Sequence, residues 1–293
     1  SGQLVGEAMH VEGARAGGTS FTANSGSSFI LTGSVGGVSY AFNRFTSPMF
    51  GGFDGFDITE KDPFRNALLS VNQTERDNSP FYSLKKAIDV TSDAEFVEYD
   101  VAVMPGITNN SLNTQLISSC EERGDSMAII DLPGNYTPPE HSISDEKDRL
   151  GSVDEVVQSA KDLGLNSSDG CTFYPYVQIR DTISDSVLYV PPSVVALGTF
   201  SSAQRKSAVW FAPAGFTRGG LSEGSAGLPV IGVRQRLTSD DRDKLYEVNI
   251  NPIASFPAEG IVIFGQKTLQ VTPSALDRIN VRRLMIFIKK EIS

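Results

Sequence analysis

The 293-residue sequence contains few of the side chains that usually carry catalytic and metal chemistry. It has two cysteines, Cys120 and Cys171, and two histidines, His10 and His141. Two cysteines are too few for a disulfide-rich scaffold or a cysteine-based zinc site, so we expect both to be free, buried thiols. Two histidines sharply limit acid–base and metal chemistry. The composition therefore predicts no metal site and no cofactor.

Long apolar runs and an excess of positive charge are also absent. No apolar run exceeds about six residues, whereas a membrane-spanning helix needs about 20. The net charge is -10, while a nucleic-acid-binding surface requires many clustered Lys and Arg side chains. We therefore expect neither a membrane span nor a nucleic-acid partner.

The sequence does hold ample material for a core. Hydrophobic residues make up 40% of the chain, including 17 Phe and 8 Tyr. A chain of this length buries about three quarters of the surface that it exposes when unfolded. This composition excludes disorder, and the length suits about two domains.

The composition and the pattern of predicted strands and helices change twice along the chain. Residues 1–50 are rich in Gly and Ser and contain short β-like pieces, among them Phe29–Leu31 and the alternation Val38, Tyr40, Phe42. Residues 51–212 alternate strand and helix patterns, which is typical of an α/β domain. Residues 213–293 combine helices with a strand in a third region. The predicted fold class is therefore α/β, or α+β overall.

The strongest local signal is a strand–helix–strand unit. A buried strand at Val101–Met104 ends at Pro105, a helix runs from about Ser111 to Gly124, and a second strand follows at Met127–Leu132. Such a unit predicts parallel strands joined by a right-handed crossover.

Cap signals place two further helices. Ser152 and Glu155 form a capping box for a helix that ends at Gly164. Thr238 or the next residue begins a charged helix that continues through Leu245. Both helices belong to the folded part of the chain, the first in residues 51–212 and the second in residues 213–293.

Two short motifs superficially resemble ligand sites. The glycine-rich stretch 219–224 lacks a following Lys-Ser/Thr, so we interpret it as a mobile surface loop rather than a phosphate cradle. Four crowded carboxylates fail the spacing of an EF-hand loop, so we interpret them as a solvated acidic turn: Asp54, Asp57, Glu60 and Asp62.

One arrangement could belong to a serine hydrolase. Asp131, His141 and Ser201 follow the chain order of a subtilisin triad, but a triad is defined by geometry rather than by order. His141 lies in a Pro-rich loop, and the surroundings of Ser201 lack a nucleophile motif. We therefore expect no enzyme. Two alternatives stay open: a cryptic serine hydrolase, and a passive surface or receptor-binding module suggested by residues 1–50.

The last helical pattern, residues 281–292, is the one strongly basic feature. Within residues 276–293, five cations stand against Asp277 and Glu291, a net of +3; they are Arg278, Arg282, Arg283, Lys289 and Lys290. Cations near a helix end can be favoured simply by the helix dipole, with their stems lying along apolar surface. The same cations could instead dock an acidic partner. We expect Leu284, Phe287 and Ile288 to be core residues of this helix.

Ten short blocks stand out along the chain: Gly51–Gly55, Tyr82–Ile88, Val103–Gly106, Arg123–Asp131, Phe173–Val177, Val190–Ser193, Trp210–Gly215, Val248–Ile253, Gly260–Leu269 and Ile279–Leu284. In this order and spacing they resemble the contractile-tail sheath proteins of bacteriophages, with the giant phiKZ-like phages as the expected branch. The resemblance covers nearly all of residues 51–293.

The resemblance implies a domain organisation. Residues 51–212 correspond to a subtilisin-like α/β sheath domain without protease activity. Residues 213–293 correspond to a truncated sheath C-terminal domain, and residues 1–50 to part of a β-rich insertion domain. The N-terminal and C-terminal arms of the family are expected to be missing from this chain.

The resemblance also implies a role, partners and a location. A sheath protein is a structural subunit of the virion tail that is assembled in the host cytoplasm. It polymerises with itself around the inner tail tube, meets baseplate and tail terminator proteins at the ends, and contracts without ATP to drive the tube through the host envelope. The basic residues Arg278, Arg282, Arg283, Lys289 and Lys290 are then expected to contact the tube or a neighbouring subunit.

Overall fold

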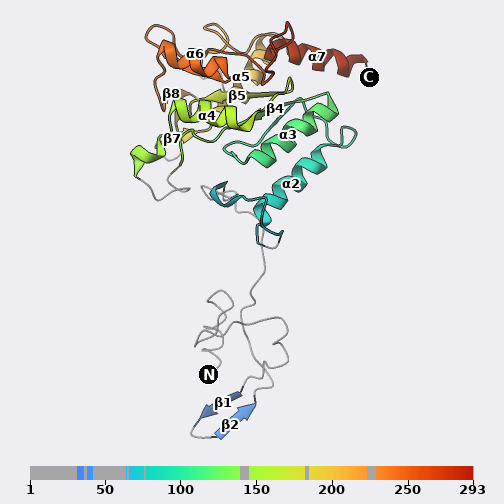
Figure 1. Cartoon of the computed structure of the whole chain (residues 1–293), viewed down its shortest axis with the longest axis vertical. Coiled ribbons are helices and arrows are strands. Elements are labelled where there is room, and N and C mark those ends of the chain that lie inside the picture. Colours follow the sequence, from blue (N-terminus) through green and yellow to red (C-terminus); the bar gives the residue numbers. More distant parts are fainter. Residues whose placement is uncertain are drawn as a thin grey trace. The chain divides into compact units, whose positions relative to one another are not determined.

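The computed structural model describes residues 32–35, 38–41, 64, 66–75, 77–138, 145–181, 185–222, 227 and 229–292. The chain divides into two compact units, Ser1–Asp57 and Ile58–Ser293. In the first unit, β1 (Thr32–Val35) and β2 (Val38–Ala41) form an antiparallel hairpin (Figure 1). The hairpin includes the predicted alternation at Val38 and Tyr40, whereas the predicted strand Phe29–Leu31 lies outside the described residues.

A five-stranded sheet forms the centre of the second unit, in the order β10-β9-β5-β4-β3. Three strands, β3 (Val101–Val103), β4 (Met127–Ile130) and β5 (Gly170–Tyr174), run parallel. The fourth, β9 (Asn251–Phe256), pairs parallel to β5, and β10 (Gly260–Ile263) pairs antiparallel to β9. The predicted parallel strand–helix–strand unit is therefore confirmed.

Helices cover both faces of this sheet (Figure 1). On one face, Ala128 and Ile130 of β4 pack into a core with α2 (Ser79–Thr91), α3 (Asn110–Arg123), α4 (Val153–Leu163) and α6 (Ser239–Glu247). On the other face, Met127 and Ile129 pack with α5 (Pro192–Lys206) and α7 (Ile279–Ile292). Successive strand residues point to opposite faces, so a strand that is buried on both sides reads as an unbroken apolar run.

Local chemistry fixes the helix ends at the predicted residues, and of the capping box predicted for α4 the structure shows the hydrogen bond to the Ser152 side chain. The Ser152 side chain accepts a hydrogen bond from the Glu155 amide at the start of α4. Thr238 and Asp241 form a reciprocal capping box at the start of α6. Gly124 and Gly164 end α3 and α4 in the left-handed conformation, with φ of 67° and 58°, which glycine adopts without a steric cost.

A second, antiparallel sheet joins three strands in the order β7-β6-β8. They are β6 (Val177–Arg180), β7 (Val187–Val190) and β8 (Val230–Val233). Two short 3₁₀ turns, η2 (Asn66–Leu68) and η3 (Glu146–Arg149), complete the described elements. No described helix is long and apolar enough to cross a bilayer.

The central sheet draws strands from both predicted ranges, 51–212 and 213–293, since β9 and β10 continue it beyond β5. The proposed domain boundaries stay a prediction. Both cysteines are free and buried, as expected.

The prediction for the core of α7 was wrong. Its buried residues are Ile279, Arg283 and Ile286, whereas Ile288 is 39% exposed. Leu284 and Phe287 are half-buried. The reason is that α7 packs one narrow stripe against the sheet, and the buried stripe includes an arginine that the hydrophobic pattern alone would not select.

Candidate interaction surface

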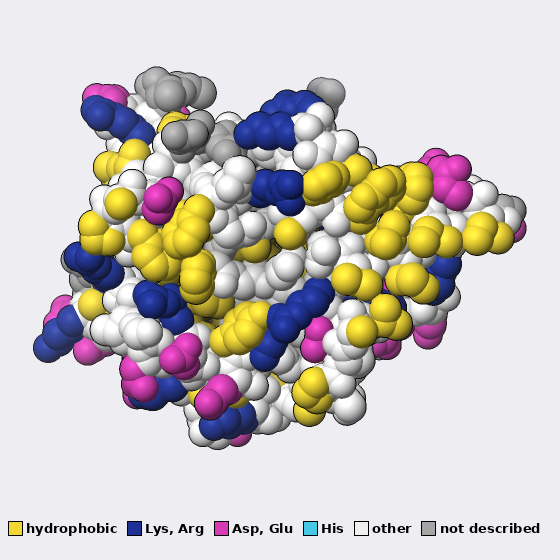
Figure 2. Space-filling view, turned by 90° about the horizontal axis from the view of Figure 1, so that it is seen from above, with side chains coloured by type: hydrophobic (Ala, Val, Ile, Leu, Met, Phe, Trp, Pro, Cys, Tyr) yellow, Lys and Arg dark blue, Asp and Glu magenta, His cyan; other side chains and the backbone are white. Residues whose placement is uncertain are grey.

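The helix α7 carries apolar side chains on two sides. Ile279 and Ile286 pack into the core of the second unit, and the Phe287 ring lies 5.2 Å from that of Trp210. Away from this buried stripe, Ile288 and Ile292 are exposed. Figure 2 shows hydrophobic side chains in a row along this end of the molecule. A surface helix normally keeps its outer side polar, so this apolar outer side marks α7 as a candidate contact element.

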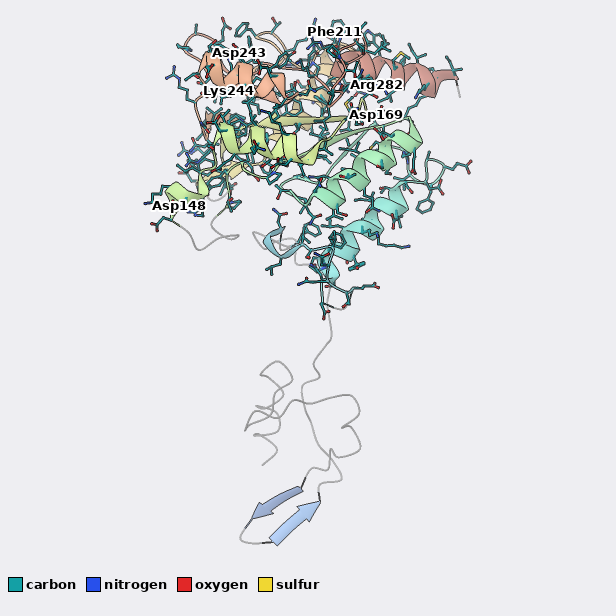
Figure 3. The ribbon with its side chains drawn as sticks, viewed as in Figure 1. Asp148, Asp169, Phe211, Asp243, Lys244 and Arg282 are labelled. Atoms are coloured by element: carbon teal, nitrogen blue, oxygen red, sulfur yellow. The ribbon has the colours of Figure 1, made fainter. Side chains whose placement is uncertain are left out.

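The two basic side chains near the start of α7 are held by groups of the same chain. Arg282 donates to the Asp169 carboxylate at 2.7 Å, and both side chains are mostly buried (Figure 3). Arg278 donates to the Tyr246 hydroxyl and lies 3.3 Å from the Asp277 carboxylate. These two cations therefore tie α7 to the start of β5 and to α6.

Arg283 is a structural residue of the core. Its side chain is 3% exposed, its guanidinium lies 5.0 Å from the centre of the Phe200 ring, and it donates to the Gln204 side-chain oxygen at 3.1 Å. Burial lowers the pKa of Arg283 from its ordinary value. An arginine in this position cannot reach an external partner without leaving the core.

The two lysines near the end of α7 reach back to the loops beside the sheet. Lys290 binds the Asp100 carboxylate at 2.6 Å and the Tyr99 carbonyl at 3.1 Å. Lys289 is exposed and donates to the Gly124 carbonyl at 3.2 Å. All five predicted interaction residues thus contact groups of their own chain. The helix-dipole interpretation fits only Lys289 and Lys290, which lie in the last turn of α7. Their role toward a tube or neighbour stays a prediction.

A groove of about 580 Å³ lies beside the last turns of α7. Its apolar lining comes from Met285, Ile288 and Ile292 of α7 together with Ala94 of the α2–β3 loop. Charged side chains of both signs complete the wall: Glu98, Arg123, Asp125, Lys289 and Lys290. An apolar groove bounded by charges is the kind of surface that takes a protein segment.

The two described hydrolase candidates, Asp131 and Ser201, lie in different surroundings. Asp131 follows β4 and is fully buried, where its carboxylate accepts hydrogen bonds from the Ser193 hydroxyl at 2.6 Å and the Gly106 amide at 2.8 Å. Burial raises the pKa of Asp131 to about 6. Ser201 is exposed on α5, and His141 lies outside the described residues. Asp131 therefore joins the start of α5 to the β3–α3 loop.

Sequence analysis missed Ser193 as the partner of Asp131. The two residues are 62 positions apart, and no motif links them. The sequence offered only an indirect signal. Ser193 lies in the first turn of a helix that begins at the second of two prolines, and Asp131 lies at the carboxyl end of a parallel strand. Such positions come together at one edge of an α/β sheet.

The other sequence candidates yield no ligand site. The expected mobile loop at 219–224 is wrong for its first part, because Leu221 is buried and its amide donates to the Ile261 carbonyl of β10. Several candidates lie outside the described residues: His10, Asp54, Asp57, Glu60, Asp62, Glu223 and Gly224. Across the described ranges, no group of three or more His, Cys, Asp or Glu side chains could hold a metal ion.

Comparisons with known proteins point to one group. No protein-family model matches the chain. The tail sheath protein of Vibrio phage KVP40 is 38% identical over 125 residues, which cover 43% of this chain and 17% of that protein. The tail sheath protein of Enterobacteria phage T4 is 28% identical over 221 residues, covering 71% of this chain and 32% of that protein. The chain thus spans less than a third of the length of these relatives.

Solved structures of similar fold include sheaths of contractile injection systems. The contracted helical sheath of the anti-feeding prophage is 21% identical, with a TM-score of 0.48 over 75% of this chain and 51% of that chain. The contracted PVC sheath gives a TM-score of 0.49 at 20% identity, over 67% of this chain and 47% of that chain.

The similarity to tail sheath proteins rests on the sequence relatives. The tail sheath protein of Salmonella phage ViI is a third, 29% identical over 59% of this chain and 27% of that protein. None of the three is named as an enzyme, in agreement with the prediction for this chain. The α/β fold class agrees with the sheets and helices described above, while the subtilisin-like detail stays a prediction. The predicted resemblance of this chain to phage tail sheath proteins is confirmed.

Proposed function

We propose that the chain is part of a structural subunit of a contractile phage tail sheath. The observation that carries this proposal is the similarity to the T4 tail sheath protein, which extends over 71% of the chain rather than over one short motif. The subunit takes its place in the virion tail after assembly in the host cytoplasm.

In this proposal, copies of the subunit stack around the inner tail tube and meet baseplate and tail terminator proteins at the two ends. A contact between two different surfaces of identical subunits does not have to close on itself, and it generates an open helical array when it does not. A cylinder around a tube needs such an array.

Contraction requires no ATP when the same subunit has two packings of different free energy. A gap of a few kcal/mol per subunit is typical of two alternative packings, and it multiplies over many copies. A subunit that moves as a body suits this mechanism. The two buried clusters on either face of the central sheet support such rigidity.

Strand addition by terminal arms is the proposed link between neighbouring subunits. An added strand binds mainly through main-chain hydrogen bonds, so it can tether subunits while their larger faces repack. The outer strand β3 supports this link, because within the described residues it pairs only with β4. An unpaired edge offers free amides and carbonyls to an incoming strand.

The end of α7 is the proposed contact with an acidic tube surface or with a neighbour. Lys289 supports this role best, since it is exposed at the groove. The double substitution K289E/K290E should weaken tube attachment while the subunit stays folded. The measurement is tube decoration by the protein that contains this chain, seen by electron microscopy, with E75K/D162K as a distant control. Unchanged decoration would contradict the tube contact.

Electron microscopy also tests the function itself. The protein that contains this chain should form hollow cylinders, alone or with its tube protein. A protein that never polymerises under any condition, while the chain turns over a substrate, would contradict the sheath function.

A further inference from the structure

The outer side of α7 and the loop after α2 both present apolar side chains at or beside the groove. Met285, Ile288 and Ile292 lie on the groove side of α7, and Ile292 is 80% exposed. The facing loop adds Ala94 at the groove and Phe96, which is 75% exposed two residues later. Exposed apolar groups gathered around a groove indicate an interaction surface.

The loop that faces α7 at this groove is acidic, with Asp93, Glu95, Glu98 and Asp100 within eight residues. The groove wall itself carries two carboxylates, Glu98 and Asp125, and three cations, Arg123, Lys289 and Lys290. Arg123 is paired with Asp125, and Lys290 with Asp100. Between Lys86 and Arg123 the sequence has no Lys or Arg at all. The loop side of the groove therefore suits a segment that is apolar and basic.

The same chain presents such a segment. Residues 205–218, from the end of α5 onward, carry Arg205, Lys206 and Arg218, and all three are exposed. Trp210 and Phe216 in this segment are 40% and 49% exposed. From Ser186 to Ser222 the sequence contains no Asp or Glu.

The cations of this segment are available, unlike those of α7. Arg218 lies over the Phe211 ring at 4.2 Å, and among the described residues none of Arg205, Lys206 and Arg218 forms an ion pair. Aromatic and arginine side chains are the residues that most often dominate binding energy at protein interfaces.

We propose that the basic aromatic segment 205–218 of one copy docks along the acidic loop 93–100 at the groove beside α7 of another copy. The proposal rests on the sheath function for its choice of a second copy as the partner. Opposite charges orient the two copies, and the apolar groups supply the buried area. The two surfaces differ, so the contact is heterologous and can propagate along an array.

The test is a charge swap followed by sedimentation velocity of the whole 293-residue chain at low ionic strength. The wild-type chain should self-associate weakly, and added salt should weaken the association. E95K/E98K and R205E/K206E should each lower the association constant at least about tenfold. The combined variant E95K/E98K/R205E/K206E should restore association, because the charges are again opposite.

The control variant E75K/D162K makes the same change in net charge as E95K/E98K on two exposed carboxylates of other elements, and it should associate like the wild type. Circular dichroism melting curves confirm that each variant is folded. Three results would overturn the contact: a wild-type chain that stays monomeric at millimolar concentration, a loss of association in the control, or a combined variant that fails to recover.

The same variants in the protein that contains this chain separate the contact from the function. Cylinders that form with the wild type and the combined variant, but not with either reversal alone, support the contact. Cylinders that form equally with every variant overturn the contact and leave the sheath function standing. An absence of cylinders with the wild type counts against the function.

Discussion

The helix α7 and the segment 205–218 are both basic, but their cations do different things. Arg282 and Lys290 on α7, and Arg278 directly before it, each bind a carboxylate of the same chain. In the segment, the three cations have no such partner among the described residues. The denser cluster in the sequence is thus the less available one in the fold. A run of like charge shows where cations are, but only the fold shows which of them are free.

The largest expected effect on stability comes from reversing the charge of the buried Arg283 on α7, and the comparison is the same reversal at the exposed Arg205. R283E should lower the free energy of unfolding by about 3 kcal/mol or more, because it buries an unpaired carboxylate against Phe200. R205E on the exposed end of α5 should change it by less than about 0.5 kcal/mol. Urea unfolding of the two variants gives both numbers. Equal destabilisation would mean that Arg205 is also structural.

A second prediction concerns a buried carboxyl rather than a buried cation. The pKa of Asp131 is raised to about 6 from an ordinary 3.8, so the folded chain holds a proton there that the unfolded chain has lost. The free energy of unfolding should therefore fall as the pH rises from about 4 to about 6, and then show no further contribution from this group. The whole change should be at most about 3 kcal/mol, since each pKa unit corresponds to about 1.4 kcal/mol.

Chemical unfolding at a series of pH values measures this slope. The variant D131N should flatten it in that window, whatever its effect on absolute stability. A variant at an exposed carboxylate, such as D162N, should keep the wild-type slope. An unchanged slope in D131N would show that Asp131 titrates normally.

A third prediction compares a mostly buried ion pair with exposed ion pairs. R282A should cost about 1–3 kcal/mol, because it leaves the mostly buried Asp169 carboxylate without its charged partner. K244A breaks the exposed pairs with Asp154 and Asp240 and should cost less than about 1 kcal/mol. Double-mutant cycles with D169A and D154A isolate the two couplings. Similar coupling energies would contradict the difference in burial.

The smallest effect is expected on the outer side of α7. I288S should change the stability of the chain by less than about 1 kcal/mol, because Ile288 makes only part of its contacts within the fold. I286S, two residues earlier on the buried stripe, should cost about 3 kcal/mol. Thermal melts of the two variants decide this. A large loss in I288S would place that side chain in the core after all.

Local features of the fold could be read from the sequence, and long-range ones could not. The helix ends at Ser152, Gly124 and Gly164 follow from side-chain and backbone chemistry within a few residues. The addition of β9 to the sheet depends on pairing between Phe173 and Asn251, which no local pattern encodes. Non-local strand pairs of this kind are set by the packing of the whole domain.

The candidate surface shows the same limit. The sequence located the cations of α7, but their partners lie far away along the chain: Asp169 is 113 residues from Arg282, and Asp100 is 190 residues from Lys290. The buried Arg283 was unpredictable for another reason, since arginine rarely occupies a core position. The sequence pattern did not single out the cations at 205–218, because they are fewer and more widely spaced than those of α7.

The bonds made by Lys289 and Lys290 have a mechanical consequence. They fasten the final turns of α7 to the end of α3 and to the residues that lead into β3. We therefore expect a force applied at Ile292 to be transmitted to β3, the edge strand at the other end of the sheet from β10, rather than to bend α7 away from the second unit. The last helix is thus anchored near both ends, by Arg282 at its start and by Lys289 and Lys290 in its final turn.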